Sequence, residues 1–241
     1  MKITIKTILV IVALIIIGLY TFTEVTYFAS KTINEENIDY PVIKIPKINV
    51  QEKINNQSLS QGVYIEPNSN NPQKGEINIY GHRTLQGSAF LRLNELNPGD
   101  TITLNWPGIG QLNYKVNSTQ IVSQYTTLNI SNETQKINLI TCHPIGSTSQ
   151  RLIVTADLIN TTELNNNIIH ENPQKDYGII ITIAFLALGL IITYLYPKEE
   201  RTIILITILI ITIILIYINF FPIDSQYLAD KLGWLNSFYN F

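Results

Sequence analysis

The sequence predicts an all-β domain that closes into a barrel and is carried by three membrane-spanning helices. Charged residues make up only 14% of the 241 residues, against roughly 25% in an ordinary soluble domain. The deficit is concentrated in three apolar stretches, each long enough or nearly long enough to cross a bilayer as a helix. Between the first and second stretch, apolar and polar residues alternate with a period of two, which is typical of β-strands.

Composition also excludes several classes of protein. Three apolar stretches argue against a simple cytosolic enzyme, and they leave too much of the chain outside the bilayer for a polytopic transporter. The formal net charge is −2, so the chain lacks the basic character of a nucleic-acid binder. We therefore expect membrane lipid, and no nucleic acid, among its partners.

The first apolar stretch predicts an N-terminal signal anchor over residues 1–23. Lys2 and Lys6 precede the apolar run, and the positive-inside rule places this end in the cytoplasm. A cleavable signal peptide is the alternative, but the bulky residues at 20–24 offer no small-x-small cleavage site. We expect a linker over 24–40, either a tether or a helix that extends the first span, and then a domain on the extracellular side of the cell membrane.

The other two apolar stretches predict a helical hairpin that follows the domain. We place a linker at 161–177, membrane-spanning helices at 178–196 and 202–222, and a cytoplasmic turn at 197–201. Leucines and aromatic residues recur at helical spacing in the tail, so residues 223–241 are predicted to lie on the outer membrane surface as an amphipathic helix. A frayed polar tail is the alternative.

The central domain, placed at residues 41–160, contains at least six predicted strands. The alternating runs are 42–50, 76–80, 100–105, 112–122, 136–141 and 151–158. Pro46 suggests an edge or a bulge in the first run, and the segment 88–96 fits one or two helical turns. Short strands at regular intervals with one short helix favour a closed barrel, which leaves no exposed edge.

Three residues at predicted strand ends are capable of covalent chemistry. His82 directly follows one strand, Cys142 ends another, and Arg151 opens the next. A thiol needs a nearby base or cation before it becomes a good nucleophile, and a histidine can take and return the proton. An arginine stays cationic and can stabilise an oxyanion. If the strand ends meet at one rim of the barrel, these side chains can act together.

The surrounding residues leave several alternatives open. Cys142 is the single cysteine of the chain, so it is either an inert apolar residue or a free reactive thiol. A zinc site is a poor explanation because a structural site needs four ligands and the chain has three histidines. His143 competes with His82 as the base, although neighbours on a strand point to opposite faces. We expect Arg83 and Arg92 to be surface or salt-bridge residues.

The central domain resembles the sortases, the membrane-anchored cysteine transpeptidases of Gram-positive bacteria and some archaea. The resemblance runs from Ile45 to about Leu158, nearly the whole domain. Its segments are Ile45-Pro46-Lys47-Ile48, Gly81-His82-Arg83, Phe90-Leu91-Arg92-Leu93, Gly99-Asp100-Thr101-Ile102, Leu139-Ile140-Thr141-Cys142 and then Arg151. Each segment alone is common, but their order and spacing together are specific.

The resemblance implies a sortase-type barrel of about eight strands and an enzyme that requires no cofactor and no metal. Cys142 would attack the threonine carbonyl of a Leu-Pro-x-Thr-Gly-like C-terminal sorting signal of a secreted protein. An amine acceptor in the cell wall or in another protein subunit would resolve the thioacyl intermediate. His82 would transfer protons, Arg151 would stabilise the oxyanion, and Thr141 would help to shape the substrate pocket.

Departures from the family pattern leave the subclass open. Thr141-Cys142-His143-Pro144 is closer to the housekeeping-like and sporulation-type classes, but two C-terminal membrane helices are unusual. Tyr80 stands where a small residue is common, and no acidic cluster predicts the calcium that some relatives bind. Two alternatives remain: a catalytically inactive barrel that serves as a binding or scaffold protein, and a cysteine endopeptidase that uses water as the acceptor.

Overall fold

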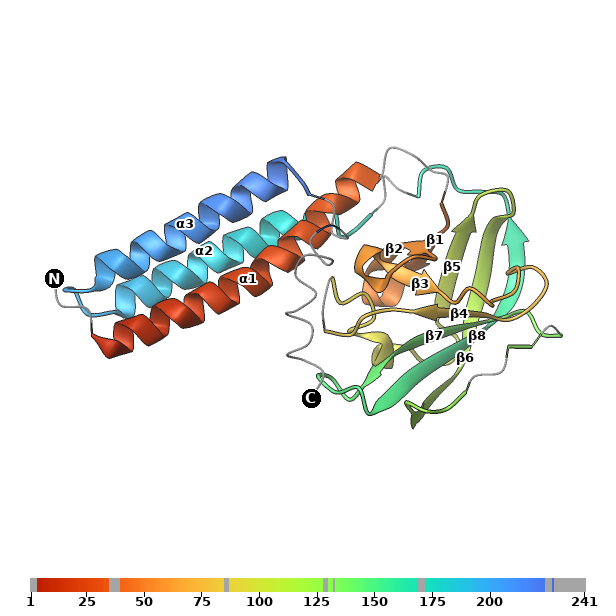
Figure 1. Cartoon of the computed structure of the whole chain (residues 1–241). Helices are drawn as coiled ribbons and strands as arrows, with labels where there is room; N and C mark the ends of the chain where they lie inside the picture. The colour runs from red at the N-terminus through yellow and green to blue at the C-terminus, as the bar shows by residue number, and fades with distance from the viewer. Residues whose placement is uncertain are drawn as a thin grey trace. The chain divides into compact units, whose positions relative to one another are not determined.

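The computed structural model places the chain in two compact units. It describes residues 4–34, 40–84, 87–127, 130–131, 133–168, 172–223 and 227. One unit contains the helices α1 (Ile5–Asn34), α2 (Tyr177–Leu195) and α3 (Arg201–Phe220), and the other contains the strands (Figure 1). The predicted amphipathic tail lies outside the described residues, apart from residue 223 and residue 227.

All three helices are long and apolar enough to cross a membrane. The candidate spans are Ile5–Lys31 within α1 and the full lengths of α2 and α3. The first helix continues past residue 23, the predicted end of the anchor, to Asn34, so the first part of the predicted linker is a helix that extends the span. Val25 and Phe28, in the predicted linker, are 0% and 5% exposed, so burial of apolar side chains carries the helix onward.

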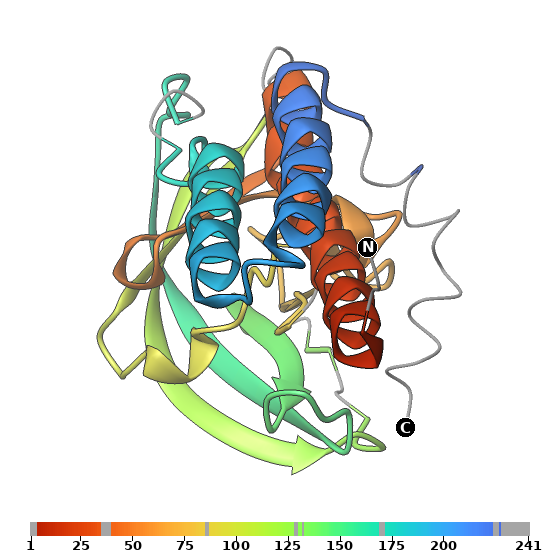
Figure 2. The same cartoon turned by 90° about the vertical axis from the view of Figure 1, so that its left-hand side faces the viewer.

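The helices pack closely through glycines, and both views of the chain show them side by side (Figures 1 and 2). A Cβ atom on Gly18 of α1 would lie 3.0 Å from Ile211 of α3, and one on Gly189 of α2 would lie 2.6 Å from Ile208 of α3. Small residues let helix backbones approach closely in a membrane, where packing rather than the hydrophobic effect drives association. The three helices therefore form one bundle rather than separate tethers.

Glu200, in the turn between α2 and α3, bonds to the N-terminal end of α1. Its carboxylate accepts hydrogen bonds from the Thr4 amide at 2.7 Å and from the hydroxyl groups of Thr4 and Thr7. These bonds hold the pKa of Glu200 below its usual range, and the bond from the Thr7 hydroxyl contributes most. The beginning of α1 and the α2–α3 turn thus lie at the same end of the bundle.

Eight strands form a closed barrel in the order β1-β2-β3-β4-β7-β8-β6-β5. The strands are β1 Val42–Ile45, β2 Val50–Asn55, β3 Val63–Ile65, β4 Ile77–Tyr80, β5 Thr101–Trp106, β6 Gly110–Ser123, β7 Lys136–His143 and β8 Gln150–Thr162. β1 closes the barrel by pairing with both β2 and β5, and β4 runs parallel to β7. The predicted closed barrel is confirmed.

Alternate residues of the strands fill the barrel. The inward set includes Ile77 and Ile79 of β4, Ile137 and Leu139 of β7, and Leu152, Val154 and Ala156 of β8, all buried in one core. Because side chains on a strand alternate between the two faces, the residues between these point outward. This alternation decides which side chains of β4, β7 and β8 share the outer face.

Pro46 does not mark an edge or a bulge. The predicted run 42–50 covers β1, the 3₁₀ turn Pro46–Ile48 and only the first residue of β2, and Asn49 ends the turn with a left-handed φ of 54°. Proline suits the first position of such a turn, where its missing N–H is not needed. The segment 88–96, predicted to form one or two helical turns, contains one 3₁₀ turn, Leu93–Glu95.

Candidate active site

Cys142 and Arg151 lie side by side on the outer face of the barrel. They are register partners in the antiparallel pair of β7 and β8, and such partners have Cα atoms about 4.5–5.5 Å apart. The preceding pair in the register, Thr141 and Leu152, includes a core residue, so Cys142 and Arg151 point outward. Both are partly buried. The predicted nucleophile and the predicted cation thus occupy matching positions on two strands.

His82 follows β4 on the other side of Cys142. β4 and β7 are parallel, with Tyr80 opposite Ile140, and the same register carried on by two residues places His82 opposite Cys142. The His82 carbonyl accepts a hydrogen bond from the amide of Phe90 at 2.9 Å, which fixes the chain after the strand. Neighbouring strands lie about 4.8 Å apart. Extending the register in this way puts His82 in one row with Cys142 of β7 and Arg151 of β8. We call these three residues the catalytic row after their predicted roles.

Thr141 points into the barrel and joins the two segments that carry the row. It is 3% exposed, and its hydroxyl donates to the carbonyl of Gly81 at 2.8 Å. The amide of Gly81 in turn donates to the carbonyl of Ile140 at 3.1 Å. The described contacts of Thr141 thus connect β7 to the chain just before His82, and its predicted role in the substrate pocket stays a prediction.

We expect Thr141→Val to destabilise the domain and Thr141→Ser to restore it. Valine has nearly the shape of threonine but leaves the Gly81 carbonyl without its hydrogen bond, which costs about 1–3 kcal/mol for a buried group. The measurement is the free energy of unfolding by urea. If valine changes only the KM of a peptide substrate and leaves the stability unaltered, Thr141 acts in the substrate pocket instead.

Arg151 directs part of its guanidinium group to the loop between β7 and β8. Its Nη1 atom donates to the carbonyls of Thr148 at 2.7 Å and Gln150 at 3.0 Å. Its Nε and Nη2 atoms make no hydrogen bond within the described part of the chain. Burial and Glu66 raise the pKa of Tyr80, and the positive charge of Arg151 opposes this shift. Arg151 is thus held in place with donors left for a ligand on the outer face.

Arg83 is buried behind the catalytic row, so the predicted surface position is wrong for this residue. It is 5% exposed, and its guanidinium lies 3.0 Å from both the Cys142 carbonyl and Nδ1 of His143. His143 consequently lies on the side opposite Cys142, as strand alternation requires. Arg92 does behave as predicted, because it is exposed and paired with Glu95 at 2.7 Å.

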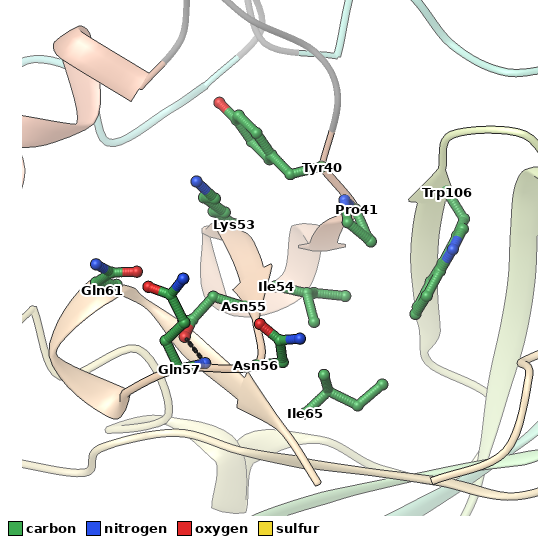
Figure 3. A pocket seen from close by; sticks show the side chains of 10 residues that line it. All are labelled: Tyr40, Pro41, Lys53, Ile54, Asn55, Asn56, Gln57, Gln61, Ile65 and Trp106. Atoms are coloured by element: carbon green, nitrogen blue, oxygen red, sulfur yellow. Dashed lines mark hydrogen bonds between the residues drawn. The ribbon is translucent and has the colours of Figure 1, made fainter. Parts of the chain in front are cut away.

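A pocket of about 450 Å³ lies beside the ends of β2 and β5 (Figure 3). It is lined by Tyr40, Pro41, Lys53, Ile54, Asn55, Asn56, Gln57, Gln61, Ile65 and Trp106. Asn55, at the end of β2, pairs with Tyr64 of β3, and Tyr64 pairs with Tyr80 at the end of β4. No residue of the row lines this pocket.

The chemistry of the row is that of a thiol, an imidazole and a guanidinium group. Among the described residues, no group of three or more His, Cys, Asp or Glu side chains is arranged to hold a metal ion. A thiolate can attack a carbonyl, an imidazole can carry the proton between the reacting groups, and a guanidinium can stabilise the developing negative charge. This combination suits acyl transfer through a covalent intermediate.

The domain that carries the row also matches a known protein family. A family model described as the sortase domain matches residues 32–159, which include the three residues of the catalytic row. The chain belongs to the sortase family. This sortase has no match among curated proteins, and its subclass stays open.

Solved sortase structures resemble about half of this chain. Sortase C-1 from Actinomyces oris is 30% identical with a TM-score of 0.46, and the match covers 50% of this chain and 74% of that one. Sortase A from Corynebacterium diphtheriae is 26% identical with a TM-score of 0.47, and the match covers 55% of this chain and 66% of that one. Clostridium perfringens sortase C, solved with the C-terminal cell wall sorting motif, is 27% identical with a TM-score of 0.45, and the match covers 49% of this chain and 69% of that one.

Proposed function

We propose that this sortase is a cysteine transpeptidase that cleaves a Leu-Pro-x-Thr-Gly-like sorting signal of secreted proteins and joins the threonine to an amine acceptor. One observation carries the proposal: Cys142 has Arg151 as its register partner on one side, and the β4–β7 register leads to His82 on the other. Acyl transfer needs a nucleophile, a proton carrier and an oxyanion donor within reach of one carbonyl carbon, and this row supplies all three.

The first half of the reaction forms the thioacyl enzyme. The Cys142 thiolate attacks the threonine carbonyl carbon, and the free N–H groups of Arg151 stabilise the resulting oxyanion. When the tetrahedral species collapses, the threonine–glycine C–N bond breaks and His82 gives a proton to the leaving glycine amine. The products are a thioester on Cys142 and a free glycine peptide.

The second half transfers the acyl group. The amine acceptor attacks the thioester, His82 takes a proton from the attacking nitrogen, and the C–S bond breaks to return the Cys142 thiolate. A new amide bond then joins the threonine to the acceptor. Water in place of the amine gives hydrolysis, which is the endopeptidase alternative.

The test uses the full chain in detergent micelles with fluorescent peptides that carry Leu-Pro-x-Thr-Gly variants, in the presence and absence of a glycine-based amine. Mass spectrometry is expected to find the threonine–amine adduct and an acyl group on Cys142. Cys142→Ala is expected to yield neither. Full activity of Cys142→Ala contradicts the proposal. Cleavage without the adduct supports the endopeptidase, and binding without cleavage supports the scaffold.

We also propose that the protein is a multi-pass protein of the cell membrane with its sortase domain outside the cell. Three helices of sufficient length and apolarity support the number of spans, and Lys2 and Lys6 before the first span support the orientation. Reporters inserted in exposed loops are expected to show residue 108 outside and residue 198 inside. Detection of residue 108 in the cytoplasm contradicts the orientation.

A further inference from the structure

Arg83 connects three segments of the domain behind the nucleophile. Its Nη1 atom donates to the Cys142 carbonyl at 3.0 Å and lies 3.0 Å from His143 Nδ1, and its Nη2 atom donates to Asn94 Oδ1 at 2.8 Å. Cys142 and His143 end β7, Asn94 belongs to the 3₁₀ turn, and Arg83 itself follows β4. One buried guanidinium thus fixes the end of the strand that carries the nucleophile.

The contact with Cys142 continues the β4–β7 ladder beyond the end of β4. In that ladder the Gly81 amide donates to the Ile140 carbonyl at 3.1 Å, and the next bond of a parallel ladder would run from the amide of Arg83 to the carbonyl of Cys142. In this structure the side chain of Arg83 donates to that carbonyl. Arg83 therefore supplies the hydrogen bond that the sheet lacks at the nucleophile.

The contact with His143 fixes the protonation of that ring. A guanidinium group has only donors, so at 3.0 Å from Arg83 the Nδ1 atom of His143 must be the acceptor. The ring is then neutral and carries its proton on Nε2. A His143 in this state, held on the opposite side of the strand from Cys142, leaves the proton transfers to His82.

Charge supports the same arrangement. Burial lowers the pKa of Arg83, and a negative charge on Cys142 opposes this shift. An arginine remains protonated in proteins, and the described groups that accept its hydrogen bonds, the Cys142 carbonyl, His143 Nδ1 and Asn94 Oδ1, are all uncharged. The buried cation of Arg83 thus lies beside the backbone of Cys142, and no carboxylate is among its described hydrogen-bond partners.

We propose that Arg83 is a positioning residue that fixes the backbone of Cys142 and holds His143 as a neutral hydrogen-bond acceptor. The kinetic part of this inference rests on the proposed function, whereas the structural part does not. Lysine can keep the charge but cannot present two nitrogens in a planar fork to three acceptors. Arg83→Lys is therefore expected to behave like Arg83→Gln in positioning.

The experiment compares Arg83→Gln, Arg83→Lys and Asn94→Ala in the full chain, with the exposed Arg92→Gln as the matched control. We expect kcat for peptide cleavage to fall about 10- to 100-fold in both Arg83 variants, as for a displaced catalytic group, while KM changes less than about twofold. Histidine ¹⁵N spectra are expected to show a fixed Nε2–H tautomer of His143 in the native protein and in Arg92→Gln. That fixed tautomer should be lost in both Arg83 variants.

Each outcome decides the inference. An unchanged His143 tautomer together with an unchanged kcat in Arg83→Gln overturns it, and so does full rescue by Arg83→Lys. If the Arg83 variants do not fold, Asn94→Ala decides, because the exposed Asn94 supports the fork without lying in the core. Asn94→Ala should lower both kcat and the rate at which iodoacetamide alkylates Cys142. If both rates are unchanged, the inference is overturned. If no peptide is cleaved even by the native protein, the proposed function fails, while the tautomer and the alkylation rate still test Arg83.

Discussion

His82→Gln is expected to lower kcat for cleavage of the sorting signal by about 1,000-fold, the typical contribution of a positioned acid–base group. Glutamine keeps much of the size of histidine and its hydrogen-bonding capacity, but it cannot protonate the leaving amine. Cys142 and Arg151 keep their places because their pairing belongs to β7 and β8. KM should change less than about twofold, because the lost interaction acts only in the transition state.

The matched control is the same substitution at the neighbouring histidine. In His143→Gln the amide oxygen can still accept the hydrogen bond that Arg83 donates to Nδ1, so we expect kcat to stay within about tenfold of the native value. Circular dichroism and the rate of Cys142 alkylation check that both variants are folded. The opposite pattern, an active His82→Gln and an inactive His143→Gln, would make His143 the acid–base residue.

The barrel was predictable because its long strands keep a strict period of two. The sequence shows at least six alternating runs, whereas the structure has eight strands. β3 is missed because Val63–Ile65 spans only three residues, too short for a period to be seen. β2 is missed apart from Val50, because the predicted run 42–50 follows the apolar spacing of β1 through the 3₁₀ turn Pro46–Ile48 and stops at the first residue of β2.

The catalytic row was predictable by residue type but not by geometry. The sequence places His82, Cys142 and Arg151 at strand ends, yet only the register of β7 and β8 makes Cys142 and Arg151 partners. Strand register depends on side chains from distant segments and on turn geometry, neither of which a single strand reveals.

The burial of Arg83 was not predicted, although strand alternation in the sequence indicates it. A charged residue at a strand end is usually exposed, and that base rate led to the wrong prediction. The inward positions of β4 are Ile77 and Ile79, and the same period continued past the strand reaches positions 81 and 83. Alternation carried two residues beyond Gly81 would have placed Arg83 on the inner side.

Gly81→Ala is expected to lower kcat about 10- to 100-fold, as for a catalytic group displaced by about 1 Å, and to destabilise the domain by about 1–3 kcal/mol. A Cβ atom at this position would lie 2.5 Å from the ring of Phe90, which is 0% exposed and cannot move aside freely. Gly81 has no left-handed φ, so alanine can adopt its backbone conformation. The whole effect is therefore steric, and it acts on the residue that directly precedes His82.

A second substitution tests this cause. Phe90→Leu removes the ring that the new methyl group would meet but keeps the backbone hydrogen bond from Phe90 to the His82 carbonyl. If the clash displaces His82, then Gly81→Ala combined with Phe90→Leu should recover kcat to within about threefold of Phe90→Leu alone, a strongly non-additive result for two residues in contact. If glycine is instead needed for flexibility, the double variant remains as slow as Gly81→Ala. Kinetics and urea unfolding of the four proteins decide between the two, because only a steric cause makes both kcat and stability depend on the size of residue 90.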